Sequence, residues 1–135
     1  MQKLSIIQEE YKDDPWKVLV CCILLNQTNN LQVRPLISHF FKNWPNPASI
    51  IREDPINISN FIKSTGFQNI KAQRIREFSM VWETGIRDPH KFPGIGEYGR
   101  EAWRIFVEDD IDFIPKDKKL KMYVEYILHE SFTKV

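Results

Sequence analysis

The chain has 135 residues, of which 42% are apolar and 27% charged, and its 19 basic and 18 acidic side chains leave a net charge of +1. This length suits one domain, residues 1–135, and the composition excludes a disordered, collagen-like or coiled-coil chain. The longest apolar run, Val18 to Leu25, is well short of the roughly 20 residues that cross a bilayer, so no membrane association is expected. The residues before Trp16 show no signal-peptide pattern.

Helix signals dominate the N-terminal half. Asp14 and Pro15 predict the start of a core helix over 16–25, which five polar residues then end. Cys21 and Cys22 lie in this helix and are expected to be buried free thiols. Three further helices are predicted, over residues 31–42, 48–52 and 57–63, and Gly66 is available to end the last one.

The C-terminal half also reads as helical. A longer helix is predicted from Asn69, as its N-cap, to Gly85, with Lys71 and Arg74 off its buried face. Residues 92–96 must form a turn, and helices are predicted over 97–107 and 118–132. The last of these has a predicted buried stripe made of Leu120, Val124, Ile127 and Leu128. Only residues 111–114 hint at extended structure, so the predicted class is all-α, with about eight helices.

Residues 94–99 match the pattern G-x-G-x-x-G of dinucleotide-binding sites. That pattern requires a buried strand directly before it, and the residues before Gly94 cannot form one. Two helices joined by a Pro-Gly-apolar-Gly turn, over about residues 88–108, instead have the form of a helix-hairpin-helix. Such a turn exposes backbone N–H groups at a helix N-terminus, which suits a DNA phosphate. The alternative is a glycine turn that only packs two helices together.

Asp117 is predicted to begin the last helix, with lysines at positions 116, 118, 119 and 121 around it. The ordinary interpretation is an N-cap, and the functional one is a carboxylate placed near a phosphate-binding surface. A metal site is not expected, since no second histidine or cysteine lies at ligand spacing from His39, His90 or His129. Two cysteines are also too few for an iron–sulfur cluster.

Three segments in order resemble a known family: Asp14-Pro15-Trp16-Lys17 with Leu25-Asn26-Gln27-Thr28, the hairpin over 92–99, and residues 115–123 around Asp117. They resemble the helix-hairpin-helix DNA glycosylases, and most closely the mismatch-specific thymine/uracil glycosylase domain of methyl-CpG-binding proteins. The resemblance covers nearly the whole chain. It implies helices around a DNA-binding cleft, with residues 115–133 forming the aspartate loop and the final helix.

The resemblance assigns roles to individual residues. Asp117 matches the catalytic aspartate, which would stabilise positive charge on the sugar and position water. Tyr98 lies where bifunctional relatives carry a Schiff-base lysine, and a phenol cannot form an imine. Tyr98 and Gln8 match residues that hold the flipped pyrimidine.

The DNA-contacting residues are assigned in the same way. Phe67 matches an apolar wedge that enters the base stack, and Gln27 fills the space left by the flipped base, where methyl-CpG-linked members carry arginine. Phosphate contacts are expected from Gly94, Ile95, Gly96, Gly99, Lys116 and Lys119.

The implied function is a monofunctional glycosylase that flips out thymine or uracil paired with guanine, cleaves the N-glycosidic bond and leaves an abasic site. The rivals are a non-catalytic helix-hairpin-helix module and a bifunctional glycosylase/lyase using Lys118. No cofactor is required, although a monovalent cation can be accommodated at the hairpin. The expected partner is double-stranded DNA with a mismatched or damaged pyrimidine, bound by a monomer in the nucleus.

Overall fold

The computed structural model describes residues 5–133, and it shows helices and no strand over that range. Seven α-helices and three short 3-10 helices follow one another in these residues. Their bounds are η1 (Ile7–Tyr11), α1 (Pro15–Leu25), α2 (Asn30–Asn43), α3 (Pro47–Arg52), α4 (Pro55–Phe61), η2 (Lys63–Thr65), α5 (Gln68–Glu83), η3 (Pro89–Lys91), α6 (Glu97–Phe106) and α7 (Lys118–Thr133). The predicted all-α class is confirmed, with seven α-helices in place of about eight.

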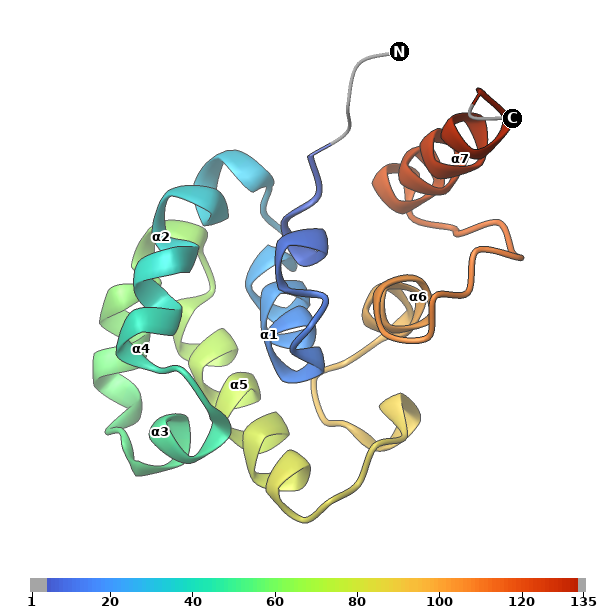
Figure 1. The fold of residues 1–135 in the computed structure, drawn as a ribbon. Coiled ribbons are helices and arrows are strands. Elements are labelled where there is room, and N and C mark those ends of the chain that lie inside the picture. The colour runs from blue at the N-terminus through green and yellow to red at the C-terminus, as the bar shows by residue number, and fades with distance from the viewer. Residues whose placement is uncertain (1–4, 134–135) are drawn as a thin grey trace.

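Helix α1 forms the centre of the molecule. Figure 1 shows α2 to α5 on one side of it, and α6 followed by α7 on the other. Eight of its eleven residues are buried, among them Cys21 and Cys22, both free thiols. A helix that is apolar on nearly every side is stable only with neighbours all round, so the prediction of a core helix is confirmed.

A side chain caps the N-terminus of each of the helices α1 to α4. The Asp14 carboxylate accepts from the Lys17 amide at 3.3 Å, and the Asn46 side chain accepts from the Ser49 amide at 2.9 Å. Asp54 caps α4, which therefore begins at Pro55, two residues before the predicted start. Each cap satisfies an amide that the helix itself leaves unpaired.

Three details of the helix predictions are wrong. Asn69 does not cap α5, because Phe67 is the N-cap residue and the Asn69 side chain accepts from the Ser59 hydroxyl at 2.5 Å. Lys71 is not off the buried face, since it is only 1% exposed. Leu128 is 40% exposed, because the buried residues of α7 lie in its first half, at Leu120, Tyr123 and Val124.

Residues 111–114 form no strand. They belong to an irregular connection from α6 to α7 that starts with the Arg104–Asp110 ion pair at 2.7 Å. The Arg104 guanidinium also lies 3.7 Å from the centre of the Phe113 ring. The alternation of apolar residues in this segment therefore does not correspond to a strand.

A cluster of rings supports the turn before α6. Phe92, buried at 4% exposure, packs against Phe78 with ring centroids 5.0 Å apart and against Trp103 at 6.0 Å. Trp82 completes this ring cluster, 5.6 Å from Phe92, and the Arg87 guanidinium lies over it at 3.6 Å. The hairpin therefore rests on the end of α5.

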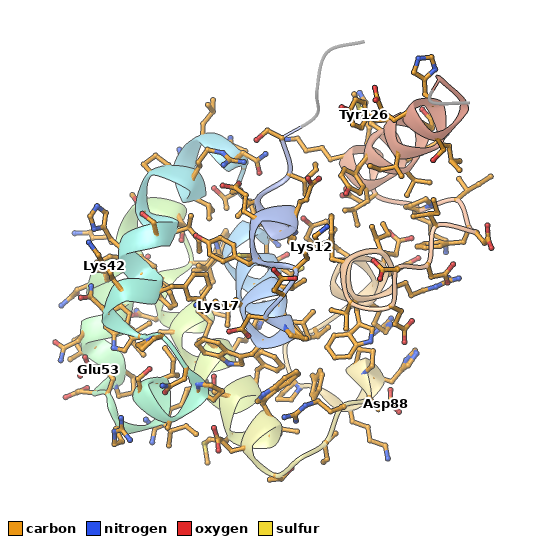
Figure 2. The ribbon with its side chains drawn as sticks, in the orientation of Figure 1. Lys12, Lys17, Lys42, Glu53, Asp88 and Tyr126 are labelled. Carbon is orange, nitrogen blue, oxygen red and sulfur yellow. The ribbon has the colours of Figure 1, made fainter. Side chains whose placement is uncertain are left out.

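Figure 2 shows Lys42 and Glu53 on the side of α1 that holds α2 to α5, and Tyr126 on α7 at the opposite side. Helix α7 packs on α6 through the rings of Phe106 and Tyr123, 5.1 Å apart. Within residues 5–133, no helix is both long enough and apolar enough to span a membrane.

Candidate active site

A hollow of about 410 Å³ opens where the α1–α2 connection meets the start of α7. We call it the aspartate hollow, and its lining residues are Leu25, Asn26, Gln27, Thr28, Asn29, Asn30, Tyr98, Asp117, Lys118 and Lys119. The fold thus brings together residues from three segments that are far apart in the sequence. Four of the predicted site residues lie here, namely Gln27, Tyr98, Asp117 and Lys119.

Asp117 is held in place by two sets of hydrogen bonds. Its own carboxylate caps α7, accepting from the Leu120 amide at 3.0 Å. The carboxylate of Glu101, only 8% exposed, accepts from the backbone amides of Lys116 at 2.7 Å and Asp117 at 3.2 Å. The turn that carries Asp117 is therefore fixed from α6, and the half-buried Asp117 side chain faces the hollow in a defined position.

Sequence reasoning missed Glu101. The available signal was its spacing, since Glu101 lies three residues after Tyr98 and thus on the same face of α6. A carboxylate on a buried face must find hydrogen-bond donors, and backbone amides of the following loop are the nearest class of donor.

Tyr98 lines the aspartate hollow and is hydrogen-bonded to a buried side chain, Gln8. The Gln8 side-chain amide, 1% exposed, donates to the Tyr98 hydroxyl at 2.5 Å and contacts the Cys22 sulfur at 3.5 Å. Burial raises the pKa of Tyr98 well above its usual value, and burial raises the pKa of the Cys22 thiol to about 12. Both groups stay protonated at neutral pH, so the Tyr98 hydroxyl accepts from Gln8 and keeps its own proton for a ligand.

Gln8 itself is not among the residues that line the hollow. It lies behind Tyr98, and its amide nitrogen is occupied by the tyrosine hydroxyl. A ligand in the aspartate hollow would therefore contact Tyr98 directly, and Gln8 would act on the ligand only by way of its hydrogen bond to Tyr98.

A second hollow, of about 500 Å³, borders the glycine turn. This hairpin hollow is lined by Cys22, Asn26, Arg74, Gly94, Ile95, Gly96, Glu97, Tyr98 and Gly99. Asn26 and Tyr98 also line the aspartate hollow, so the two are neighbours. Gly96 is the N-cap residue of α6 and provides no side-chain cap, which leaves the first amides of this helix to other acceptors.

The glycines of the turn differ in what their surroundings allow. Gly94 has φ +77° and a Cβ there would lie 3.0 Å from the Arg74 Cβ. A Cβ on Gly99 would lie 2.7 Å from Ile95 Cγ2, whereas one on Gly96 would meet no atom within 4 Å. Gly96 therefore faces open space, as a residue that approaches a ligand would.

The lysines around Asp117 do not all have the same surroundings. Lys118 and Lys119 line the aspartate hollow. Lys116 instead pairs with Glu97 at 3.0 Å, with both side chains largely exposed. This ion pair links the start of α6 to the Asp117 turn, and it is weak enough for a phosphate to replace it.

Phe67 and Gln27 share an uncommon backbone conformation. Phe67 has φ +50° and a side chain 55% exposed, and the exposed Gln27 has φ +53°. Non-glycine residues in this region are strained, and such residues cluster at functional sites. Gln27 lines the aspartate hollow, while Phe67 lies outside both hollows at the start of α5.

Metal-ligating side chains are scattered in the part of the chain that the structure describes. No group of three or more His, Cys, Asp or Glu side chains there could hold a metal ion. At the hairpin, the Ile95 carbonyl accepts from the Arg100 guanidinium at 3.4 Å.

Comparisons with known proteins give a consistent result. No family model matches the chain. A methyl-CpG-binding domain protein 4-like protein of Arabidopsis thaliana is 30% identical over 91% of this chain and 28% of its own length. A thymine/uracil-DNA glycosylase of Pyrobaculum aerophilum is 29% identical over 63% of this chain and 40% of its own. A solved structure of a thermostable thymine-DNA glycosylase has a TM-score of 0.65 at 25% identity, over 72% of this chain and 48% of that one.

The helical fold, the glycine hairpin before α6 and these likenesses confirm the resemblance of the chain to the helix-hairpin-helix DNA glycosylases. The resemblance to methyl-CpG-binding proteins is also confirmed, since the alignment with the Arabidopsis protein covers most of this chain. The chain spans less than half the length of these relatives.

Proposed function

We propose that the protein is a DNA glycosylase that removes thymine or uracil paired with guanine and leaves an abasic site. The observation that carries this proposal is that Asp117 and Tyr98 line one hollow, with Asp117 fixed at the start of α7. A target base cannot be reached inside a duplex, so it has to be flipped into this hollow.

The chemistry needs a carboxylate and a donor in that arrangement. As the bond between the sugar C1′ and the base nitrogen breaks, its electron pair leaves with the base, and C1′ becomes positive. The Asp117 carboxylate stabilises that charge and takes a proton from the water that attacks C1′. The protonated Tyr98 hydroxyl donates a hydrogen bond to a carbonyl oxygen of the departing pyrimidine, and solvent supplies the proton that neutralises it.

The proposal is for a monofunctional enzyme, since the residue at position 98 has no amine to attack the sugar. A second candidate, a glycosylase/lyase, is favoured by one observation: Lys118 lines the same hollow as Asp117. Its primary amine could form an imine at C1′ and then allow strand cleavage.

Labelled duplexes holding G·T, G·U, A·U or one modified pyrimidine separate these candidates. Strand breaks that appear only after alkali support the monofunctional enzyme, and breaks without alkali that disappear in Lys118→Met support the lyase. A protein that binds these duplexes but releases no base would be a DNA-binding module.

Asp117→Asn tests the mechanism. Asparagine keeps the size and the helix cap but removes the charge, so we expect single-turnover excision to fall at least about 100-fold while DNA binding persists. Asp54→Asn is the matched control, because Asp54 also caps a helix, α4, away from the site. Excision by Asp117→Asn near the rate of the Asp54→Asn control would refute the role of Asp117.

The remaining parts of the proposal concern partners and cellular location. Double-stranded DNA is the proposed partner of a monomeric protein, and the likeness to the Arabidopsis protein supports a nuclear location. The scheme needs no cofactor. A monovalent cation at the hairpin would bind backbone carbonyls, and it would compete with Arg100 for the carbonyl of Ile95.

A further inference from the structure

Lys71 is a buried lysine whose contacts tie together two turns at the surface. Its side chain is only 1% exposed. Its ammonium group donates to the Leu24 carbonyl at 2.8 Å, to the Thr65 carbonyl at 2.9 Å and to the Thr65 hydroxyl at 3.4 Å. An ammonium has three N–H donors, so the available partners satisfy all of them.

The acceptors lie shortly before two strained residues. Leu24 is the next-to-last residue of α1, three residues before Gln27, and Thr65 ends η2, two residues before Phe67. The Lys71 backbone amide donates to the Phe67 carbonyl at 2.9 Å as part of the first turn of α5, a bond that does not depend on the lysine side chain. Strained conformations persist only where surrounding contacts hold them, and Lys71 has contacts to both turns.

A packing role alone would not call for a lysine here. Burial lowers the pKa of Lys71 from its ordinary 10.5 to about 8, which means that placing an ammonium in this position costs free energy. An apolar side chain of similar length would fill the same space without that cost. A lysine at this position is explained by its three hydrogen bonds, which join the end of α1 to η2.

We infer that Lys71 is a positioning residue that fixes Phe67 and Gln27 relative to each other, so that both can enter a DNA duplex when a base is flipped. This inference rests on the proposed function. It assigns to the lysine a role in opening the duplex and none in breaking the glycosidic bond. A single strand, whose bases are already unstacked, should therefore not need it.

The test compares Lys71→Met with Ser79→Ala. Ser79 is the matched control, because its buried hydroxyl accepts from the Trp16 indole at 3.0 Å and likewise joins α5 to α1, but at a place away from both turns. For Lys71→Met we expect single-turnover excision of uracil to fall about tenfold or more in a G·U duplex and less than about threefold in a single strand. Ser79→Ala should change both substrates equally. Equal losses on both substrates in Lys71→Met would overturn the inference.

A double-mutant cycle supplies the second measurement. If Lys71 acts through the wedge, Phe67→Ala should cost much less in the Lys71→Met background than in the wild type. Additive effects of the two changes would mean that the lysine only supports the fold. Should Lys71→Met fail to fold, Lys71→Arg keeps the charge and several donors but alters their reach, and the same preference for single-stranded substrate is expected.

A readout without chemistry distinguishes failure of the inference from failure of the proposed function. The fluorescence of 2-aminopurine next to a G·T mismatch reports unstacking. The measurement should be made on Asp117→Asn protein, into which each further change is introduced. A fluorescence rise that is lost in Lys71→Met, but kept in Ser79→Ala, supports the positioning role even if the wild type excises no base. Equal rises with and without Lys71 would refute it.

Discussion

Phe67 combines an exposed aromatic ring with a backbone conformation that costs an ordinary residue about 1–2 kcal/mol. Neither property improves the packing of the free protein. Both are expected of a side chain that is held out from the surface to meet another molecule. The structure therefore favours an interaction role for the ring over a structural one.

Phe67→Ala should leave thermal stability within about 0.5 kcal/mol of the wild type, as for other exposed side chains. Excision from a duplex should fall about tenfold, because the ring offsets part of the free energy of unstacking. Ile56→Ala, at an equally exposed apolar residue on α4, is the control for lost apolar surface. A large drop in melting temperature for Phe67→Ala would place the ring in the core.

Among helices and turns, the hairpin offers a contrast between two of its glycines. Gly96→Val places a side chain in open space and should cost no more than about 1 kcal/mol as a changed helix cap. Its affinity should fall alike for matched and mismatched duplexes, because phosphate contacts do not read bases. Unchanged affinity of a folded Gly96→Val protein would mean that the turn only packs helices.

Gly99→Ala, unlike Gly96→Val, places its new side-chain atom against a neighbouring residue. The new methyl group would lie 2.7 Å from Ile95 Cγ2, so the turn has to deform. The overpacking cost of about 1–3 kcal/mol exceeds the roughly 1 kcal/mol that alanine adds to helix stability. Thermal melting of the two variants is the measurement that separates contact with DNA from internal packing.

The helices were predictable where a local signal decides them. Asp14-Pro15 and Asn46-Pro47 mark helix starts because a capping side chain and a proline act within one turn of backbone. The start of α5 was not predictable in this way, because it is set by Phe67 in a strained conformation and has no side-chain cap.

The candidate site was predictable only in part. Asp117 and Tyr98 stood out through their motifs, and the fold places them in one hollow. The role of Glu101 depends on Lys116, 15 residues away, and the role of Lys71 depends on Leu24, 47 residues away, as well as on the nearer Thr65. Helical periodicity assigns a charged residue to the surface unless those distant partners are known.

For the whole molecule, a net charge of +1 provides little general attraction to DNA. Under the proposed function, DNA binding would depend on local cations, such as Lys119 in the aspartate hollow, and on the backbone amides of the hairpin. Lys116 pairs with Glu97 at the start of α6, and this pairing partly neutralises the positive charge that Lys116 could offer to DNA.

Affinity for duplex DNA should fall steeply with salt, with a slope of log K against log salt of about −4 to −5 for roughly four to six neutralised phosphates. Glu97→Gln frees Lys116, so it should raise affinity at low salt and steepen the slope by about 1. Glu77→Gln, on α5, controls for the change in net charge. Binding titrations at several salt concentrations test this, and identical slopes for all three proteins would remove Lys116 from the interface.

The ring cluster of Phe78, Trp82, Phe92 and Trp103 gives the protein a built-in optical probe. Two indoles lie directly beneath the hairpin, whereas Trp16 and Trp44 are buried elsewhere, against Phe41 and Phe40. A shift of the glycine turn should change the polarity around Trp82 and Trp103 more than around the other pair. With Trp16 and Trp44 replaced by phenylalanine, the intrinsic emission of unlabelled protein would follow the docking of this turn on its ligand in real time.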